Sequence, residues 1–149
     1  KLLFFRWDGA GFNEWKEIVL PDTATYHTTC GDSICVASGK RYMLINLTTG
    51  VQKDMFDSNS AAPNAFCLPA SSELLLGRDN MSVFQDSQGR PSRKYGITWA
   101  EPASRLLYLA PYILGVLPKV VEVKLLDTQA TVQSLSLRAS LVAASPDSC

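Results

Sequence analysis

The residues best suited to nucleophilic chemistry are His27, the only histidine in the chain, and Cys30, three positions later. A cysteine beside a histidine can form a nucleophile–base pair, in which the imidazole accepts the thiol proton. The surrounding residues show no helical period, and on an extended segment two residues three apart point to opposite faces. We therefore interpret His27 as a surface or turn histidine and predict no catalytic pair here.

Carboxylates are the second possible source of chemistry, but four of the aspartates stand at predicted turns: Asp8, Asp22, Asp79 and Asp127. Aspartate side chains at turns accept hydrogen bonds from nearby backbone amides, which gives each of them a structural role. The sequence contains no glycine-rich phosphate loop and no metal-binding histidine motif. We therefore expect a protein that is not an enzyme and that holds neither a cofactor nor a metal.

The four cysteines are Cys30, Cys35, Cys67 and Cys149. Cys30 and Cys35 have the spacing of half a zinc site, but no second pair of cysteines or histidines matches them. We interpret the cysteines as small buried thiols on strands. A disulfide between Cys30 and Cys35 remains an alternative, although disulfides are rare in cytosolic proteins.

One charge cluster, Arg90-Pro91-Ser92-Arg93-Lys94, is a candidate binding element. The cations of Arg90, Arg93 and Lys94 could pair with an acidic patch on a partner protein, and Ser92 could be phosphorylated. The alternative is a solvated hairpin end, because isolated surface charges usually contribute little. The three cationic residues are the binding candidates that the sequence offers.

Composition narrows the class of partner. The 149 residues include 14 basic and 14 acidic side chains, so the formal net charge is zero. Such a balance argues against a nucleic-acid partner and against electrostatic docking on acidic membranes. The longest apolar stretch, Leu106 to Val123, is interrupted by prolines, a glycine and charged residues, so no transmembrane segment is predicted. Trp7, Trp15 and Trp99 are predicted to pack within or between sheets.

The elements that position these residues recur along the chain. Alternating apolar segments begin at residues 1, 41, 81 and 119, at steps of 40, 40 and 38 residues. A short apolar strand precedes each of the last three copies, and a more polar strand follows each copy after a turn. The apolar strands are Ile34 to Ala37, Leu74 to Leu76 and Ile113 to Leu117; the polar strands are Glu14 to Leu20, Val51 to Phe56, Arg93 to Trp99 and Thr131 to Leu137.

A period of about 40 residues made of short strands is typical of propeller blades. We expect the apolar strand to be the innermost strand of each blade, because inner strands are covered on both faces. Three copies and a leading half copy are too few to close a ring of about four to eight blades. The sequence therefore predicts an all-β fold: a partial β-propeller of about three and a half blades of about 40 residues, as a fragment of a larger propeller.

Short words within the repeats resemble one propeller family. They include Phe5-Arg6-Trp7-Asp8-Gly9, Leu20-Pro21-Asp22, Cys30-Gly31-Asp32-Ser33-Ile34-Cys35-Val36, Gly77-Arg78-Asp79-Asn80, Ile97-Thr98-Trp99, Pro111-Tyr112-Ile113 and Val116-Leu117-Pro118-Lys119-Val120-Val121-Glu122-Val123. In order and spacing they resemble the citron-homology (CNH) domain of the family that contains vacuolar protein-sorting protein 39 and the transforming-growth-factor-β-receptor-associated protein. The sequence departs from the family at Thr29, where tryptophan is usual, and at Ala37-Ser38-Gly39.

The resemblance covers residues 1–137, which it assigns to part of a CNH-type propeller. Residues 138–149 are left as an unassigned tail or the start of a further strand. In this family the propeller is normally followed by a long α-solenoid. No binding motif of the family is compact enough to place on individual residues of this chain.

The resemblance implies a protein-interaction module in a subunit of a vesicle-tethering complex of the HOPS or CORVET kind. Such a subunit acts with Rab-type small GTPases and other tethering subunits, and in the receptor-associated branch with the TGF-β receptor. The implied location is cytoplasmic, peripheral on endosomal or vacuolar (lysosomal) membranes through partners. The alternative is a regulatory CNH domain in a signalling adaptor, a kinase or a Rho exchange factor. An enzyme built on a propeller is a third reading, which the single histidine disfavours.

Overall fold

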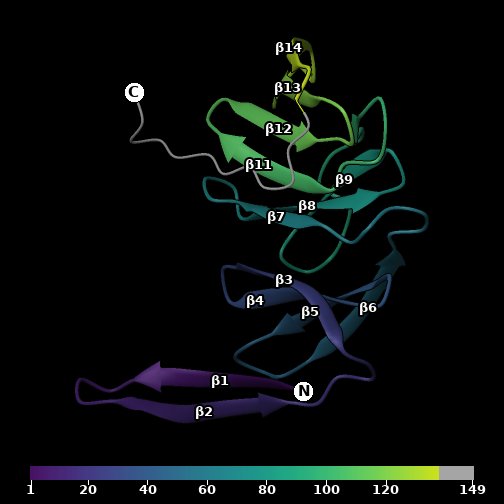
Figure 1. Cartoon of the computed structure of the whole chain (residues 1–149). Helices are drawn as coiled ribbons and strands as arrows, with labels where there is room; N and C mark the ends of the chain where they lie inside the picture. The colour runs from purple at the N-terminus through teal and green to yellow at the C-terminus, as the bar shows by residue number, and fades with distance from the viewer. Residues whose placement is uncertain (138–149) are drawn as a thin grey trace.

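The computed structural model describes residues 1–137, which form three four-stranded antiparallel sheets and one hairpin (Figure 1). The N-terminal hairpin is β1 (Leu2–Trp7) and β2 (Phe12–Ile18). The first blade is β3 (Ala24–Cys30), β4 (Ser33–Ser38), β5 (Arg41–Asn46) and β6 (Gln52–Asp57). The second is β7 (Ala65–Leu68), β8 (Glu73–Arg78), β9 (Met81–Gln85) and β10 (Ile97–Thr98). The third is β11 (Arg105–Leu109), β12 (Tyr112–Val116), β13 (Val121–Leu125) and β14 (Thr131–Leu135).

The repeat predicted from the sequence is confirmed. The four alternating segments are β1, β5, β9 and β13, and the apolar segments before them are β4, β8 and β12. The hairpin matches the last two strands of a blade: Lys16 pairs with Phe4 in the hairpin as Lys53 pairs with Leu44 in the first blade. Residues 1–137 are therefore all-β, with three blades and half of a fourth. The interpretation of residues 138–149 lies outside the described residues.

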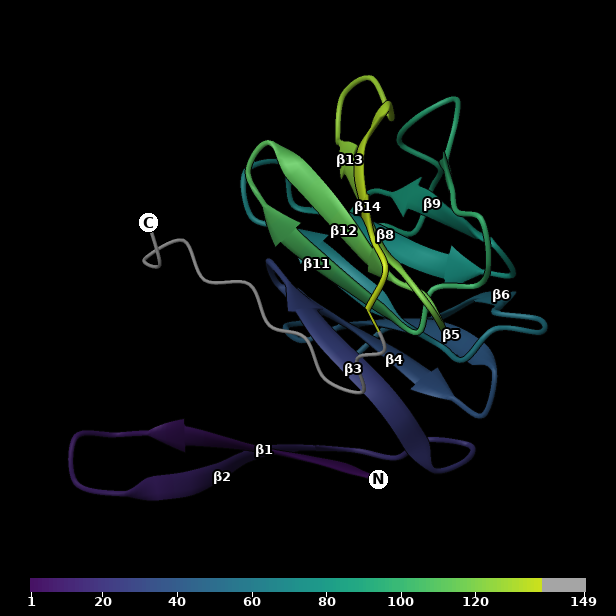
Figure 2. The ribbon, with the colours of Figure 1, turned by 45° about the horizontal axis from the view of Figure 1, so that its top comes forward.

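The predicted order of strands within a blade is wrong. Each blade begins with a further strand, β3, β7 or β11, and the apolar strand is second rather than innermost. The first strands meet between blades, β3 with β7 and β7 with β11, and Figure 2 shows β3 and β11 on one side with β6 and β9 on the other. The middle strands are the most buried because neighbouring blades cover both of their faces. By contrast, every second side chain of β3 is exposed: Thr25, His27 and Thr29. The segment therefore contains no apolar run by which a strand could be predicted.

The core consists of three apolar layers between successive units. Hairpin and first blade share a cluster of Ile18, Leu20, Ile34, Val36, Met43 and Ile45. First and second blades share one that includes Tyr42, Leu44, Leu74 and Leu76, and second and third share one around Leu75, Phe84, Trp99, Leu106 and Ile113. Trp99 packs between blades as predicted. Trp7 and Trp15 pack only within the hairpin sheet, against Phe12 and Phe4, and keep 56% and 42% of their surface exposed.

Two buried polar contacts fix the blades relative to one another. The hydroxyl of Tyr42 donates to the carbonyl of Gly77 at 2.7 Å and accepts the amide of Asn64 at 2.9 Å. The side-chain amide of Asn64, just before β7, donates to the carbonyl of Ala103, just before β11, at 2.7 Å. Because these groups are buried, each bond replaces a lost contact with water and selects one arrangement of neighbouring blades.

Candidate interaction surface

The residues first considered for catalysis are separated by the fold. His27 is exposed on β3, whereas Cys30, on the same strand, is buried with 1% of its surface exposed. Asp8 accepts the amides of Ala10 and Gly11 at its hairpin turn, and these bonds lower the pKa of its carboxyl. The fold thus separates His27 from Cys30, and the carboxylate of Asp8 has a structural role in its turn. Among residues 1–137, no three His, Cys, Asp or Glu side chains lie together as metal ligands would.

Asp79 binds the segment between the first two blades, and not the backbone of its own turn. Its carboxylate accepts the side-chain amide of Asn59 at 2.8 Å and the hydroxyl of Ser60 at 2.6 Å, in the segment that joins the first two blades. These bonds lower the pKa of Asp79 to about 2. The carboxylate is therefore occupied by the loop beside it.

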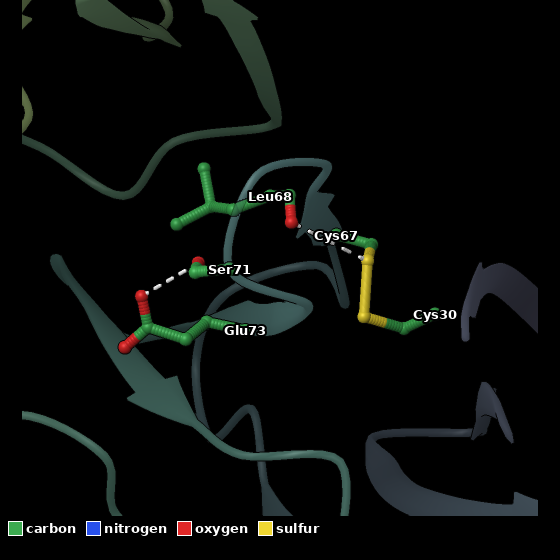
Figure 3. Close-up of a disulfide and its surroundings, with 5 residues drawn as sticks. All are labelled: Cys30, Cys67, Leu68, Ser71 and Glu73. Carbon is green, nitrogen blue, oxygen red and sulfur yellow. Dashed lines mark hydrogen bonds between the residues drawn. A yellow bond between two sulfur atoms is a disulfide. The ribbon is translucent and has the colours of Figure 1, made fainter. Parts of the chain in front are cut away.

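The cysteines form a bond that was not predicted (Figure 3). Cys30 on β3 and Cys67 on β7 are joined by a disulfide across the first two blades, with a Cα–Cα distance of 5.4 Å and a sequence separation of 37. This corrects both the interpretation of these residues as free thiols and the alternative bond between Cys30 and Cys35. The partners are distant in sequence and meet only because the first strands of adjacent blades pack together.

Cys35 is a buried free thiol, as predicted. Burial disfavours the thiolate and raises its pKa to about 12. A thiol held in the neutral form is a poor nucleophile. Cys149 lies outside the described residues.

Two of the three predicted binding residues make internal ion pairs. Arg90 contacts Asp86 at 2.9 Å, within the loop that follows β9. Arg93 donates two hydrogen bonds to Glu73, at 3.1 and 2.7 Å, and its guanidinium lies 4.1 Å from the centre of the Phe84 ring. Arg90 therefore stabilises the loop internally, and Arg93 holds it against the second blade.

Lys94 differs from these two arginines. It is exposed, its ammonium lies 5.2 Å from the ring of Tyr95, and it forms no ion pair within the described part of the chain. Lys94 is consequently the predicted candidate that stays available to a partner.

A groove lies beside this loop, between the first and second blades. It has a volume of about 410 Å³ and is lined by Phe56 of β6, Arg78 and Met81 around the β8–β9 turn, and Arg93 and Lys94. A second groove of about 330 Å³ continues from it toward Asn59 and Asp79, sharing Arg78, Met81 and Val83. We call the two together the basic groove. The amino-acid sequence does not mark Arg78 as a candidate, because Arg78 is an isolated cation in sequence and lines the same groove as Lys94 only in the fold.

One further concavity, of about 330 Å³, lies between the turn after β5 and the loop after β9. Lys53, on its wall, donates to the carbonyl of Gln88 at 2.8 Å. Its cation is therefore already used to join two blades. None of the described segments is a helix of the length and apolarity that crossing a membrane requires.

Comparison with known families identifies this architecture. The CNH domain family matches residues 1–145. The chain belongs to the CNH domain family. This confirms the resemblance drawn from the short words within the repeats.

Three curated relatives of this CNH chain carry different names. Vacuolar sorting protein 39 from Arabidopsis thaliana is 34% identical over 127 residues, which are 85% of this chain and 13% of that protein. A GTPase-activating protein from Dictyostelium discoideum is 29% identical over 149 residues, 99% of this chain and 14% of that protein. A transforming growth factor-beta receptor-associated protein 1 homolog from Danio rerio is 26% identical over 125 residues, 83% of this chain and 14% of that protein. The chain thus spans a small part of each relative.

Solved structures show the same fold. The AfRom2 CNH domain matches with a TM-score of 0.64 at 18% identity, over 85% of this chain and 45% of that one. Apo AztD from Citrobacter koseri matches with a TM-score of 0.65 at 12% identity, over 91% of this chain and 42% of that one. At these identities the comparison concerns the fold alone. It supports the arrangement of the described blades as part of a propeller.

Proposed function

We propose that this CNH chain is a protein-interaction module of a vesicle-tethering subunit that acts with Rab-type small GTPases. The observation that carries the proposal is family membership over residues 1–145 together with the similarity to vacuolar sorting protein 39. In this proposal the subunit belongs to a HOPS- or CORVET-like complex. It lies on the cytoplasmic side of endosomal or vacuolar membranes, where partner proteins hold it.

The mechanism we propose is adhesion by a rigid surface, without a catalytic step. Stacked blades hold side chains from separate sheets at fixed positions, so that a partner meets a pre-organised face. Tyr42, Asn64 and the Cys30–Cys67 bond supply that rigidity between blades. Partners of this kind would be the GTPase, other tethering subunits and, in the receptor-associated branch, a TGF-β receptor.

Residues 1–137 are, in this proposal, part of a larger CNH-type propeller. Leu3 and Phe5 of β1 stand where Met43 and Ile45 stand in β5, by the shared strand register. Met43 and Ile45 are buried against the hairpin, whereas Leu3 and Phe5 are exposed. A further blade packed on the hairpin would bury them in the same way.

The test is co-precipitation of the full-length parent protein with late-endosomal Rab proteins in the GTP-bound and GDP-bound states. We expect retention of at least one GTP-bound Rab together with other tethering subunits. The GDP-bound form of the same Rab is the control. Absence of any GTP-dependent partner under gentle washing would contradict the proposal.

The regulatory alternative is favoured by one observation, the match to a GTPase-activating protein over 99% of this chain. It predicts that the parent protein alters the GTPase cycle rather than joining a tethering complex. Single-turnover GTP hydrolysis by Rab-type and Rho-type GTPases, with and without the parent protein, separates the two functions. Acceleration of hydrolysis without recovery of tethering subunits would favour regulation.

A further inference from the structure

The basic groove exists because the outer strand of the second blade is shortened. The sequence predicted a strand over residues 93–99, but β10 contains only Ile97–Thr98, and residues 93–96 leave the sheet. Gly96 passes so close to β9 that a Cβ there would lie 2.4 Å from the carbonyl oxygen of Ser82. A glycine at this point lets the backbone come back close to β9 where β10 begins, and the groove opens beside the loop that precedes it.

The first two residues of the loop are bonded to the second blade, and the next two are exposed. Ser92 donates its amide to the carbonyl of Phe84 at 3.1 Å and its hydroxyl to Glu73 at 2.7 Å, and Arg93 binds the same carboxylate. The next two residues, Lys94 and Tyr95, point outward, and Tyr95 has 66% of its surface exposed. The Glu73 contacts therefore fix the position at which Lys94 and Tyr95 meet solvent.

The groove combines an apolar floor with unpaired cations. Phe56, Met81 and Val83 line it, and Met81 has 40% of its surface exposed. Arg78 lies over the ring of Phe56, with its guanidinium carbon 5.7 Å from the ring centre. Within the described residues neither Arg78 nor Lys94 forms an ion pair.

The nearby carboxylates are already occupied. Asp79, the neighbour of Arg78, binds Asn59 and Ser60, and Glu73 is bound to Arg93. Among the residues that line the basic groove, Arg78, Arg93 and Lys94 are cations and Asp79 is the one carboxylate, so the lining has a net charge of +2 on a chain whose net charge is zero. Carboxylates are the complementary groups for Arg78 and Lys94, and an apolar side chain fits the floor between them.

We propose that the basic groove binds an acidic segment of a partner protein that inserts one apolar side chain between carboxylates. Arg78 and Lys94 bind the carboxylates, and Met81 and Phe56 contact the apolar side chain. The apolar floor distinguishes this ligand from a nucleic acid, whose phosphates would leave Met81 exposed. The inference rests on the proposed interaction function and names the chemistry of one partner contact.

Fluorescence anisotropy with a panel of short labelled peptides tests the proposal on the full chain. Each peptide carries acidic residues on both sides of one Leu, Met, Phe or Trp. Matched peptides replace the acidic residues with Lys, or the apolar residue with Gly. We expect at least one acidic peptide to bind about tenfold more tightly than both of its matched peptides, because charge and apolar contact act together.

Reversing the charges of the groove tests whether the peptide binds there. The double variant R78E/K94E changes two exposed side chains and should weaken the peptide about tenfold or more. K119E, an exposed cation in the β12–β13 turn of the third blade, is the matched control and should leave the affinity unchanged. The free energy of unfolding of both variants, measured in urea, reports whether the fold is intact.

Several results would overturn the inference. One is that acidic and Lys-containing peptides bind equally well, and another is that no acidic peptide binds. A third is that R78E/K94E binds the peptide as tightly as the native protein does. Competition by an RNA oligonucleotide or by anionic vesicles as effective as by the peptide would show a general anion surface instead. The two tests can fail separately. If the co-precipitation retains a GTP-bound Rab but no acidic peptide binds the groove, this inference is rejected and the proposed function still holds.

Discussion

Glu73, at the start of β8, accepts hydrogen bonds from three residues. Its carboxylate accepts hydrogen bonds from Ser71, Ser92 and both donor positions of Arg93 used in the ion pair. These bonds favour the ionised form, and the one from Arg93 has the largest effect, so the pKa of Glu73 falls to about 2. A residue with no obvious role in the sequence thereby holds the loop that shapes the basic groove.

The first prediction concerns Glu73. Because its folded pKa lies below the usual value of 4.5, ionised Glu73 stabilises the fold above pH 4.5, and this stability is lost as the pH falls toward 2. Glu73→Gln should lower the free energy of unfolding by about 1–3 kcal/mol at pH 7, since Arg93 loses its partner. Urea unfolding of both proteins between pH 7 and pH 3 measures the difference, which should shrink with decreasing pH.

The control for this experiment is Asp54→Asn. Asp54 lies 3.8 Å from Arg41, and both side chains are mostly exposed, so the change should be small at every pH. A difference between the native protein and Glu73→Gln that stays constant down to pH 3 would contradict the assigned pKa.

At the scale of strands, successive blades are joined by the same device. Lys16 of β2 donates to the carbonyl of Leu47 at 2.8 Å, and Lys53 of β6 donates to that of Gln88 at 2.8 Å. Arg93, beside β9, differs: its hydrogen bonds to Glu73 of its own blade are the main cause that raises its pKa, and Asp127 in the turn of the third blade adds to the shift. In the hairpin and the first blade, a lysine on the outer strand thus reaches a turn of the next unit.

The second prediction concerns the bond between the first strands of two blades. A disulfide that closes a loop of 37 residues should stabilise the fold by about 3–4 kcal/mol, chiefly by restricting the unfolded chain. Cys67→Ser should therefore lower the free energy of unfolding by that amount in the absence of reductant. A reductant should lower the stability of the native protein and leave that of the variant unchanged.

Peptide mapping of the unreduced protein checks the pairing directly. Fragments that contain Cys30 and Cys67 should be recovered linked to each other, and Cys35 should react with a thiol reagent only after unfolding. Equal effects of reductant on the native protein and on Cys67→Ser would mean that the bond does not support the fold.

The third prediction tests the contact between the second and third blades. A Cβ at Gly115 would lie 2.7 Å from the Trp99 ring, so Gly115→Ala should displace the indole and cost about 1–3 kcal/mol of stability. Gly11→Ala is the control, because its Cβ would meet nothing within 4 Å. Urea unfolding followed by tryptophan fluorescence measures both. Equal stability of the two variants would show that Trp99 adjusts without cost.

At the scale of the whole molecule, the hairpin presents an uncovered apolar face. Leu3, Phe5, Trp7 and Phe12 are all exposed, with Phe12 at 72%, and β1 pairs only with β2 among the described strands. Contiguous exposed apolar surface and an unpaired strand edge both favour association.

The fourth prediction follows from this face. The 149-residue chain should self-associate as its concentration rises, and Phe5→Thr/Phe12→Thr should reduce the association while keeping residues that suit strands. Sedimentation velocity over a range of concentrations measures the effect. Val51→Thr, which alters an equally exposed side chain on the first blade, is the control. Association that is unchanged in the double variant would place the contact elsewhere.

The amino-acid sequence by itself determined the all-β class, the repeat and the position of most strands. β4, β5, β8 and β9 follow from apolar runs and alternation, and the Asp8-Gly9 turn from local hydrogen bonding. These signals are contained within a few neighbouring residues, since side chains alternate along a strand and turns close on themselves. The family resemblance could be drawn for the same reason, because its motifs are short and ordered along the chain.

Only the tertiary structure decided which residues meet. The sequence identified Arg93 but not its partner Glu73, and it identified Lys94 but not Arg78 across the groove. Cys30 and Cys67 likewise carry no mark of their pairing, and β3 looks polar because half of its side chains face solvent. Each of these features depends on the stacking of separate blades. Such stacking brings distant residues together by burial of whole faces, for which no local pattern codes.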